Sequence, residues 1–464
     1  MNRITRAIVF LVAAGAAAAG AGAQMTLGDA FRVADRAAYG NRAAAGDADA
    51  RRAQRLAPLK GILPSVRVEA GYLRTTDPIG VFGATLRQRT VTAADFDPQR
   101  LNYPSAIGNY LGGIVVEQPI FNADAWTGRR AAARAADASR ASEEWTRLST
   151  RVDVVRAYYG AVLAAERART LESAASAAHA HVAQAEAMVR QGLVTKSDAL
   201  LASVRAGEID MQLAEARGGA ATARQQLAVL LGGDGADRSV APRLPATLPS
   251  SDRIIAVTAG DTADVAPRPR EDVRAASRGL DAARADALRA GSAWLPRLNS
   301  FARYDWNSAN GLYGGDGNWT VGVMASWNVF AGASDVADMQ ATRGRVAAAR
   351  AQAEGAQAHA RVEVEQSRIA LSVALARLTI ADRAAAQGAE AHRIVGRKYE
   401  GGLATVAELL DAQAVETKSA LSLTEARWGA IVADAERRQA LGLDPATLAA
   451  LDETPAVATR TSGN

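Results

Sequence analysis

The chain has 464 residues and a net charge of only +5, and alanine dominates its apolar content. Alanine supplies 110 residues, aromatic residues only 5%, and arginine 50 of the 54 basic residues. The absence of cysteine excludes disulfides, thiolate metal sites, cysteine nucleophiles and a lipid-modified N-terminal cysteine. The pI of about 9.6 reflects a small surplus of arginine over acids, so no nucleic-acid-binding patch is indicated. This composition favours long helices.

The first 23 residues are predicted to be a secretory signal peptide. Arg3 and Arg6 form a charged start, residues 8–19 form a short apolar core, and an A-x-A cleavage site precedes Gln24. The core is too short for a permanent anchor, and no stretch of roughly eighteen apolar residues follows it. We therefore predict an exported protein that begins near Gln24 and has no membrane-spanning helix. An Ala-rich cytoplasmic helix is the alternative interpretation.

Proline positions divide the mature chain into two long helical arms. No proline occurs between residues 120 and 241 or between residues 297 and 444. Because the interior of a helix does not tolerate proline, both segments are predicted to be helical. The proline-rich residues 233–270 are predicted to be a linker. Residues 443–464 lose the apolar period and are predicted to form a loose C-terminal tail.

The two arms are copies of each other. Residues 190–232 align without a gap on residues 400–442, with 14 identities in 43 positions. Both segments carry G-L-x-T at the same place. Biased composition can imitate helical similarity, but it does not reproduce a helix break at constant spacing. We infer an internal duplication, with one repeat over 24–232 and a second over 271–442.

Glycine divides each arm into a long helix and a returning helix. The predicted long and returning helices cover 123–190, 194–231, 332–400 and 404–441. Shorter helices over 26–57 and 271–293 precede the arms. At about 1.5 Å per residue, each long helix extends about 100 Å. Ala-rich helices of this length are marginally stable alone, so we expect them to pack as coiled coils or as a wall of helices.

Four segments near the long helices alternate between apolar and polar residues and are predicted to form two β-hairpins. The hairpins pair 65–75 with 106–121, across a loop of about thirty residues, and 297–306 with 318–330. In the last segment Trp319 and Val321 face one way and Thr320 the other. Fifteen of the 23 aromatic residues fall within 72–126 and 294–330. Such a pattern is typical of a membrane β-barrel wall. Two soluble hairpins packed on the helices are the alternative.

The sequence contains no recognisable catalytic arrangement. His179 and His181 are two residues apart on a helix, so they point away from each other and are expected on a solvated surface. A metal site is not predicted from them. The glycine-rich run at 232–235 follows a helix, which indicates a helix stop rather than a phosphate-binding loop. We predict neither enzymatic activity nor a cofactor.

Four strands cannot close a barrel, and an open sheet edge is not tolerated inside a membrane. The chain is therefore expected to form a ring to which each subunit contributes four strands. With a signal peptide, a helix, a hairpin, a long helix, a G-L-x-T turn and a return helix, it resembles the TolC family of outer-membrane efflux ducts. The resemblance covers essentially the whole mature chain. Its motifs are Gly192–Asp198, Tyr399–Ala412, and Pro119-Ile120-Phe121 with its copy Asn328-Val329-Phe330.

The resemblance implies a mainly α protein with a membrane β-barrel, built from tandem coiled-coil hairpins and four strands per chain. It implies a homotrimer with a twelve-stranded barrel in the outer membrane of a Gram-negative bacterium, above a periplasmic α-helical tunnel. Such ducts serve tripartite efflux or type I secretion, with a periplasmic adaptor and an inner-membrane pump or ABC transporter. The alternative is a soluble periplasmic coiled-coil structural or adaptor protein, although an adaptor carries one helical hairpin. No residue selects among drugs, metal ions and proteins as substrate.

By the same resemblance, the helix-turn tips form the far periplasmic end and dock the adaptor. Glycine permits the tight turn, and a leucine repeated in both tips is expected to be exposed and to need a partner. Ordinary helix-terminating turns explain the glycines but not the leucines. The docking residues are Gly192, Leu193, Thr195, Gly402, Leu403 and Thr405.

The resemblance also implies a periplasmic gate. Glu408 and Asp411 match the family's acidic constriction, and their spacing of three places both on one helix face. Three-fold symmetry would bring six carboxylates together, which raises their pKa values and attracts cations. The family's latch bond corresponds to Asp198 and Tyr399. Ala404 replaces a basic residue of that latch, so the latch is expected to be weaker or built differently. First-turn acids that stabilise a helix N-terminus are the alternative.

Overall fold

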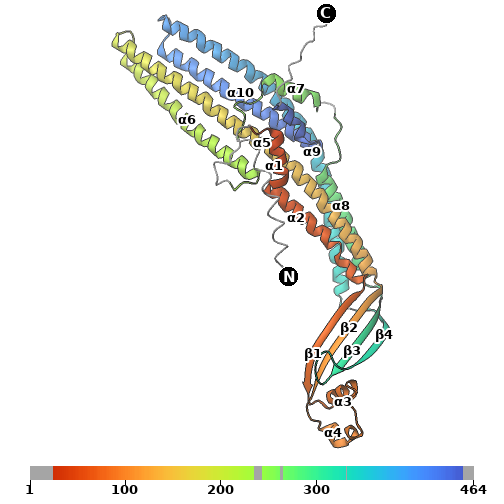
Figure 1. Cartoon of the computed structure of the whole chain (residues 1–464). Helices are drawn as coiled ribbons and strands as arrows, with labels where there is room; N and C mark the ends of the chain where they lie inside the picture. Colours follow the sequence, from red (N-terminus) through yellow and green to blue (C-terminus); the bar gives the residue numbers. More distant parts are fainter. Residues whose placement is uncertain (1–23, 235–242, 262–264, 331, 453–464) are drawn as a thin grey trace, which may run out of the picture. The chain divides into compact units, whose positions relative to one another are not determined.

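The computed structural model describes residues 24–234, 243–261, 265–330 and 332–452 (Figure 1). The predicted signal peptide lies outside the described residues, as do parts of the linker and of the C-terminal tail. The chain divides into two compact units. The helical unit comprises Met1–Ala45, Glu143–Glu271 and Ala358–Asn464, and the sheet unit comprises Gly46–Ser142 and Asp272–Gln357.

The four long helices match the predicted arms. Helix α5 spans Ala123–Arg190 and α9 spans Ser334–Glu400, and each contributes residues to both units. The returning helices are α6, Lys196–Leu230, and α10, Val406–Ala440. They begin two residues later than predicted because Thr195 and Thr405 have extended backbones and act as N-caps.

The predicted helix over 26–57 is wrong in one respect, because it is interrupted. Helix α1 spans Leu27–Ala37 and α2 spans Tyr39–Gln54, separated by Ala38, whose ψ of 131° leaves the helical region. The side-chain amide of Asn41 donates to the carbonyl of Ala34 at 3.1 Å and satisfies the broken end. The end of α6 also crowds this point, since a Cβ on Gly232 would lie 2.3 Å from the carbonyl oxygen of Ala37. Short helix η1, Ala57–Gly61, follows α2. Helix α8, Glu271–Ser292, matches its prediction.

The two predicted hairpins are joined into one antiparallel sheet of order β1-β2-β3-β4. Its strands are β1, Ser65–Thr75, β2, Ile107–Phe121, β3, Arg297–Ser308, and β4, Asp316–Ser326. The last strand ends four residues before the predicted boundary. Ser326 pairs with Arg297, and the preceding residue is Pro296, which has no N–H to extend the ladder. The connection from β1 to β2 contains α3, Pro78–Arg87, η2, Ala93–Phe96, and α4, Pro98–Asn102.

The predicted loose tail is wrong for residues 443–452. Residues Pro445–Leu451 form η4, in which Leu448 and Leu451 are buried. Arg438 of α10, buried beside Asp434 at 2.9 Å, donates to the hydroxyl of Thr447. The tail therefore packs on the helical unit because its apolar and polar side chains find partners there. Within the predicted linker, residues Ser251–Asp261 form α7.

The core of the helical unit lies where α1, α5, α7, α10 and η4 meet. Its fully buried side chains include Leu27, Tyr158, Ile254, Ile431 and Leu448. Alanine fills much of the remaining contact area, which allows the helices to approach closely. No helix among the described residues is both long enough and apolar enough to cross a membrane.

Candidate gate and docking tips

The turns that join long and returning helices have the same geometry in both repeats. Gly192 and Gly402 have φ values of +72° and +69°, a region that side chains other than glycine rarely adopt. The backbone N–H of Leu193 donates to the Met188 carbonyl at 2.9 Å, and that of Leu403 donates to the Lys398 carbonyl at 2.8 Å. These are Schellman turns. They leave Leu193 and Leu403 65% and 82% exposed, respectively.

Both returning helices begin with a capping box that uses one of the predicted gate acids. The Asp198 carboxylate accepts from the backbone N–H and the hydroxyl of Thr195, at 3.0 and 2.9 Å. The Glu408 carboxylate accepts from the same groups of Thr405, at 2.7 and 3.1 Å. These bonds lower the pKa of Glu408, so its carboxylate stays ionised at neutral pH. A capping role is therefore present in the single chain, as the alternative interpretation of Glu408 anticipated.

Tyr399 belongs to an apolar cluster next to the tips. Its side chain is buried together with Val406 and Leu409, and its hydroxyl donates to Sδ of Met188 at 3.2 Å. Burial raises the pKa of Tyr399, and the nearby Asp198 carboxylate raises it further. Tyr399 and Asp198 are thus brought near each other, while each makes its hydrogen bonds to other groups among the described residues.

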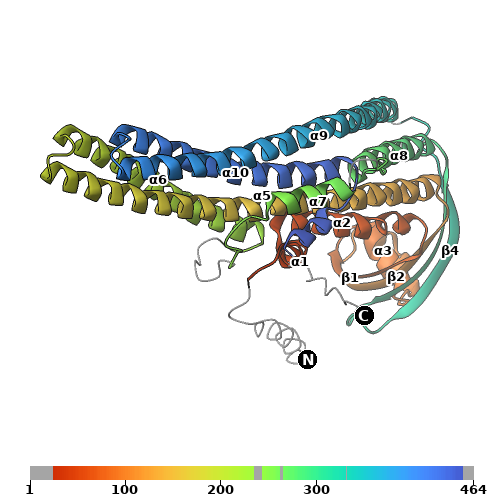
Figure 2. The ribbon, with the colours of Figure 1, turned by 90° about the horizontal axis from the view of Figure 1, so that it is seen from above.

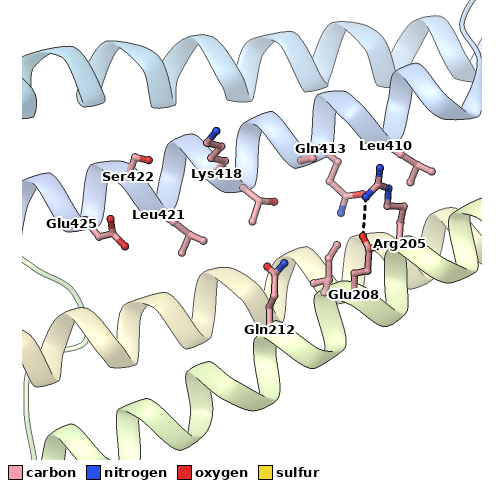
Figure 3. Close-up of a pocket in the computed structure, with 12 residues that line it drawn as sticks. Arg205, Glu208, Gln212, Leu410, Gln413, Lys418, Leu421, Ser422 and Glu425 are labelled. Atoms are coloured by element: carbon pink, nitrogen blue, oxygen red, sulfur yellow. Dashed lines mark hydrogen bonds and ion pairs between the residues drawn. The ribbon is translucent and has the colours of Figure 1, made fainter.

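Asp411 is exposed near one end of a groove that the sequence analysis missed. The groove lies between α6 and α10, has a volume of about 430 Å³, and is lined by residues that include Arg205, Glu208, Leu410 and Lys418 (Figure 3). Arg205 bonds Glu208 at 2.8 Å, and this bond, with a smaller contribution from Asp411, raises the pKa of Arg205. The groove therefore brings a permanent cation close to a predicted gate acid.

A second missed feature is a histidine pair between α5 and α9. The expected solvated surface describes His179, which bonds Asp210 at 3.0 Å, but it is wrong for His181. The His181 ring stacks edge to face on His392 with ring centroids 6.0 Å apart, and its pKa is lowered by burial and by His392. His392 bonds Glu416 of α10. The only sequence signal was that His181 and His392 occupy nearly equivalent positions of the two repeats.

Within the described ranges, no three His, Asp or Glu side chains are arranged to hold a metal ion. Two duplicated helix hairpins with capped tips and a four-stranded sheet define a mainly helical protein whose distinctive features lie at the tips and on the sheet faces.

Comparisons with known proteins agree with this class. The model of the family described as outer membrane efflux protein matches residues 42–233 and 265–443, so the chain belongs to that family. The predicted resemblance to TolC-type ducts is confirmed, and an outer-membrane location follows from the family. The family is one of transport proteins. A search of curated proteins found no sequence that matches significantly.

Solved structures support the fold. The Campylobacter jejuni CmeC outer membrane channel is similar with a TM-score of 0.74 and 16% identity, over 90% of this chain and 86% of that one. The outer membrane protein VceC from Vibrio cholerae has a TM-score of 0.70 and 18% identity, over 90% and 96% of the two chains. The open state of the Neisseria gonorrhoeae MtrE outer membrane channel has a TM-score of 0.68 and 18% identity, over 90% and 89%.

Proposed function

We propose that the chain is one subunit of a trimeric exit duct, in which three sheets close a twelve-stranded barrel in the outer membrane above a periplasmic helical tunnel. The observation that carries this proposal is the four-stranded sheet. Its edge strands, β1 and β4, each pair with one strand among the described residues. Open edges leave backbone groups without partners inside a bilayer, and joining three sheets edge to edge removes every edge.

The two faces of the sheet support a barrel wall. On one face Val68, Trp319 and Val323 are all more than 60% exposed. On the other face Arg303 bonds Asp305 and lies 4.0 Å from Glu69, across Gly113 of β2. A large exposed apolar face needs a covering, which outer-membrane lipid would supply. The polar face suits a water-filled lumen.

The helices carry apolar stripes that suit a homotrimer. Helix α9 exposes Val362, Ile369, Val373 and Ile380, which are spaced by seven, four and seven residues. Helix α6 exposes Leu200, Val204 and Met211, spaced by four and seven. This heptad spacing is typical of coiled-coil contacts, and two further copies of the chain would bury both stripes.

We infer that Glu408 and Asp411 line the periplasmic gate. Both are exposed near the tips, and the lowered pKa of Glu408 keeps it charged. Arg205 is the candidate for the cation that Ala404 cannot supply, since Asp411 contributes to its raised pKa. The latch between Asp198 and Tyr399 stays a proposal, supported by the influence of Asp198 on the pKa of Tyr399.

The tips are the proposed docking site for a periplasmic adaptor. The exposed Leu193 and Leu403 give each tip an apolar contact that solvent does not satisfy. The adaptor would connect the duct to an inner-membrane pump or ABC transporter, for efflux or type I secretion. A soluble adaptor-like coiled coil is the alternative, and the exposed apolar face of the sheet disfavours it.

Fractionation and native mass spectrometry test the proposal together. The full-length protein is expected to remain in outer-membrane vesicles after carbonate extraction and to appear in detergent as a trimer. A stable monomer released by carbonate would contradict the duct and favour the soluble alternative.

A further inference from the structure

The connection between β1 and β2, residues 76–106, is a folded element of the sheet unit. Asp77 caps α3 by accepting from the N–H of Gly80 at 2.6 Å. Phe82 of α3 and Phe96 of η2 pack edge to face with ring centroids 5.7 Å apart. Loops of this length without such contacts are usually mobile, so these contacts give the connection a defined shape.

Three buried amide side chains fasten this connection to the sheet. The Gln88 amide donates to Oδ1 of Asn109 at 2.8 Å, and the Asn109 amide donates to Oδ1 of Asn307 at 2.8 Å. All three side chains are at least nine-tenths buried. Arg89 adds an ion pair with Asp316 at 3.4 Å. The connection is thus attached to β2, β3 and the start of β4.

The attachment lies on the polar face of the sheet. Asn109 is four residues from Gly113, whose partners across the ladder are Glu69 and Asp305. Asn307 is two residues from Asp305, so period-two alternation puts all these positions on one face. Figure 2 shows α3 on the concave side of the curved sheet. The concave, polar side is the inside of the proposed barrel.

We propose that residues 76–106 form a restriction at the external mouth of the duct that keeps bulky solutes out of the lumen. This inference rests on the proposed barrel. Three copies of the connection would surround one opening from its inner wall. Their exposed apolar residues, Ile79, Phe96 and Tyr103, supply surface for contact between copies. Outgoing substrate would displace connections held by a few hydrogen bonds, each of modest net strength.

A single cysteine on either sheet face tests the proposal in intact cells, because the chain has no other cysteine. Met324→Cys is on the polar face, eight residues along β4 from Asp316 at the attached end. Val323→Cys is on the apolar face. The reagents are a small sulfonated maleimide and a maleimide with a long polyethylene glycol chain, both added outside. Met324→Cys should react with the small reagent and be protected from the large one.

Loosening the attachment should remove this protection. Adding Gln88→Ala should raise the labelling of Met324→Cys by the large reagent about tenfold, because the loss of hydrogen bonds of ordinary net strength makes opening easier by about that factor. Replacing residues 78–103 by a short Gly-Ser turn should raise the labelling by the large reagent further. Arg87→Ala, on an exposed neighbour, is the matched control and should change nothing. Trimer bands on gels confirm that each variant assembles.

The outcomes separate this inference from the proposed function. Equal labelling by the large reagent with and without Gln88→Ala and with the shortened connection overturns the restriction alone. Labelling of Val323→Cys by the small reagent, or failure of that reagent to reach Met324→Cys in the variant with the shortened connection, overturns the barrel assignment itself.

Discussion

Asp452 shows how one side chain attaches the C-terminal segment to the core. Its carboxylate accepts from the backbone N–H of Leu27 at 2.7 Å and from the hydroxyls of Tyr158 and Tyr159, both at 2.9 Å. Asp452→Ala would leave a buried tyrosine hydroxyl without an acceptor. We expect a loss of about 2–3 kcal/mol in the free energy of unfolding, seen as a lower melting temperature in detergent.

The control for this prediction is Asp49→Ala, which breaks an exposed pair with Arg52. An exposed ion pair contributes less than about 1 kcal/mol to the free energy of unfolding, so the melting temperature of the Asp49→Ala variant should hardly differ from that of the wild type. Equal effects of the two substitutions would contradict the role given to Asp452.

The lowered pKa of His181 predicts that the protein loses stability in mild acid. Its pKa is lowered in the folded protein, so near and below pH 6.5 the unfolded chain binds more protons than the folded one. Stability from the neutral ring is therefore present at neutral pH and is lost as the pH falls through about 6.5. The titratable groups that face the ring are His392 and, beyond it, Glu416.

Melting temperatures at several pH values between neutral and mildly acidic test this prediction. The wild type should lose more stability on acidification than His181→Gln, whereas His179→Gln, with an exposed ring, should behave as the wild type. Identical pH dependence in all three proteins would show that His181 is not the sensitive group.

At the scale of elements, the capping boxes should hold the tips together. Thr195→Ala and Thr405→Ala each remove an N-cap side chain, which bonds Asp198 and Glu408, respectively. Each substitution should destabilise its helix by about 1 kcal/mol. Because helix ends can open locally, we expect about fivefold faster amide hydrogen exchange in the affected tip. Thr222→Ala, within α6, removes only a bond to the Gly218 carbonyl and should not accelerate exchange. Unchanged exchange in both cap variants would show that the caps do not limit opening.

At the scale of the whole assembly, the proposed acidic gate should make the duct cation-selective. Single-channel recordings of the wild type are expected to show cation selectivity and block by multivalent cations from the periplasmic side. The double variant Glu408→Gln, Asp411→Asn should lose most of the cation selectivity and most of the block by multivalent cations. Glu425→Gln, an exposed acid farther along α10, is the control and should leave both intact. If the double variant keeps its selectivity and block, the gate lies elsewhere.

Local features could be predicted from the sequence. The two helical arms followed from the absence of proline, and the tips that end α5 and α9 followed from Gly192 and Gly402, because helix formation and termination depend on nearby backbone bonds. The strands followed from their period-two alternation. The duplication was visible because both repeats keep the same break at the same spacing.

Features that depend on distant segments were decided only by the tertiary structure. The pairing of β2 with β3, the break at Ala38 and the burial of His181 each require residues far away in the chain. The packing of η4 had a local signal in Asp444-Pro445 followed by Leu448 and Leu451, yet its burial depends on α10 and α5. For the proposed gate acids, the sequence singled out Glu408 through its family resemblance, and the fold revealed its bond to Thr405. Backbone conformation is determined largely by residues that are adjacent in sequence, whereas burial and side-chain pairing are determined by residues that are adjacent in the folded structure.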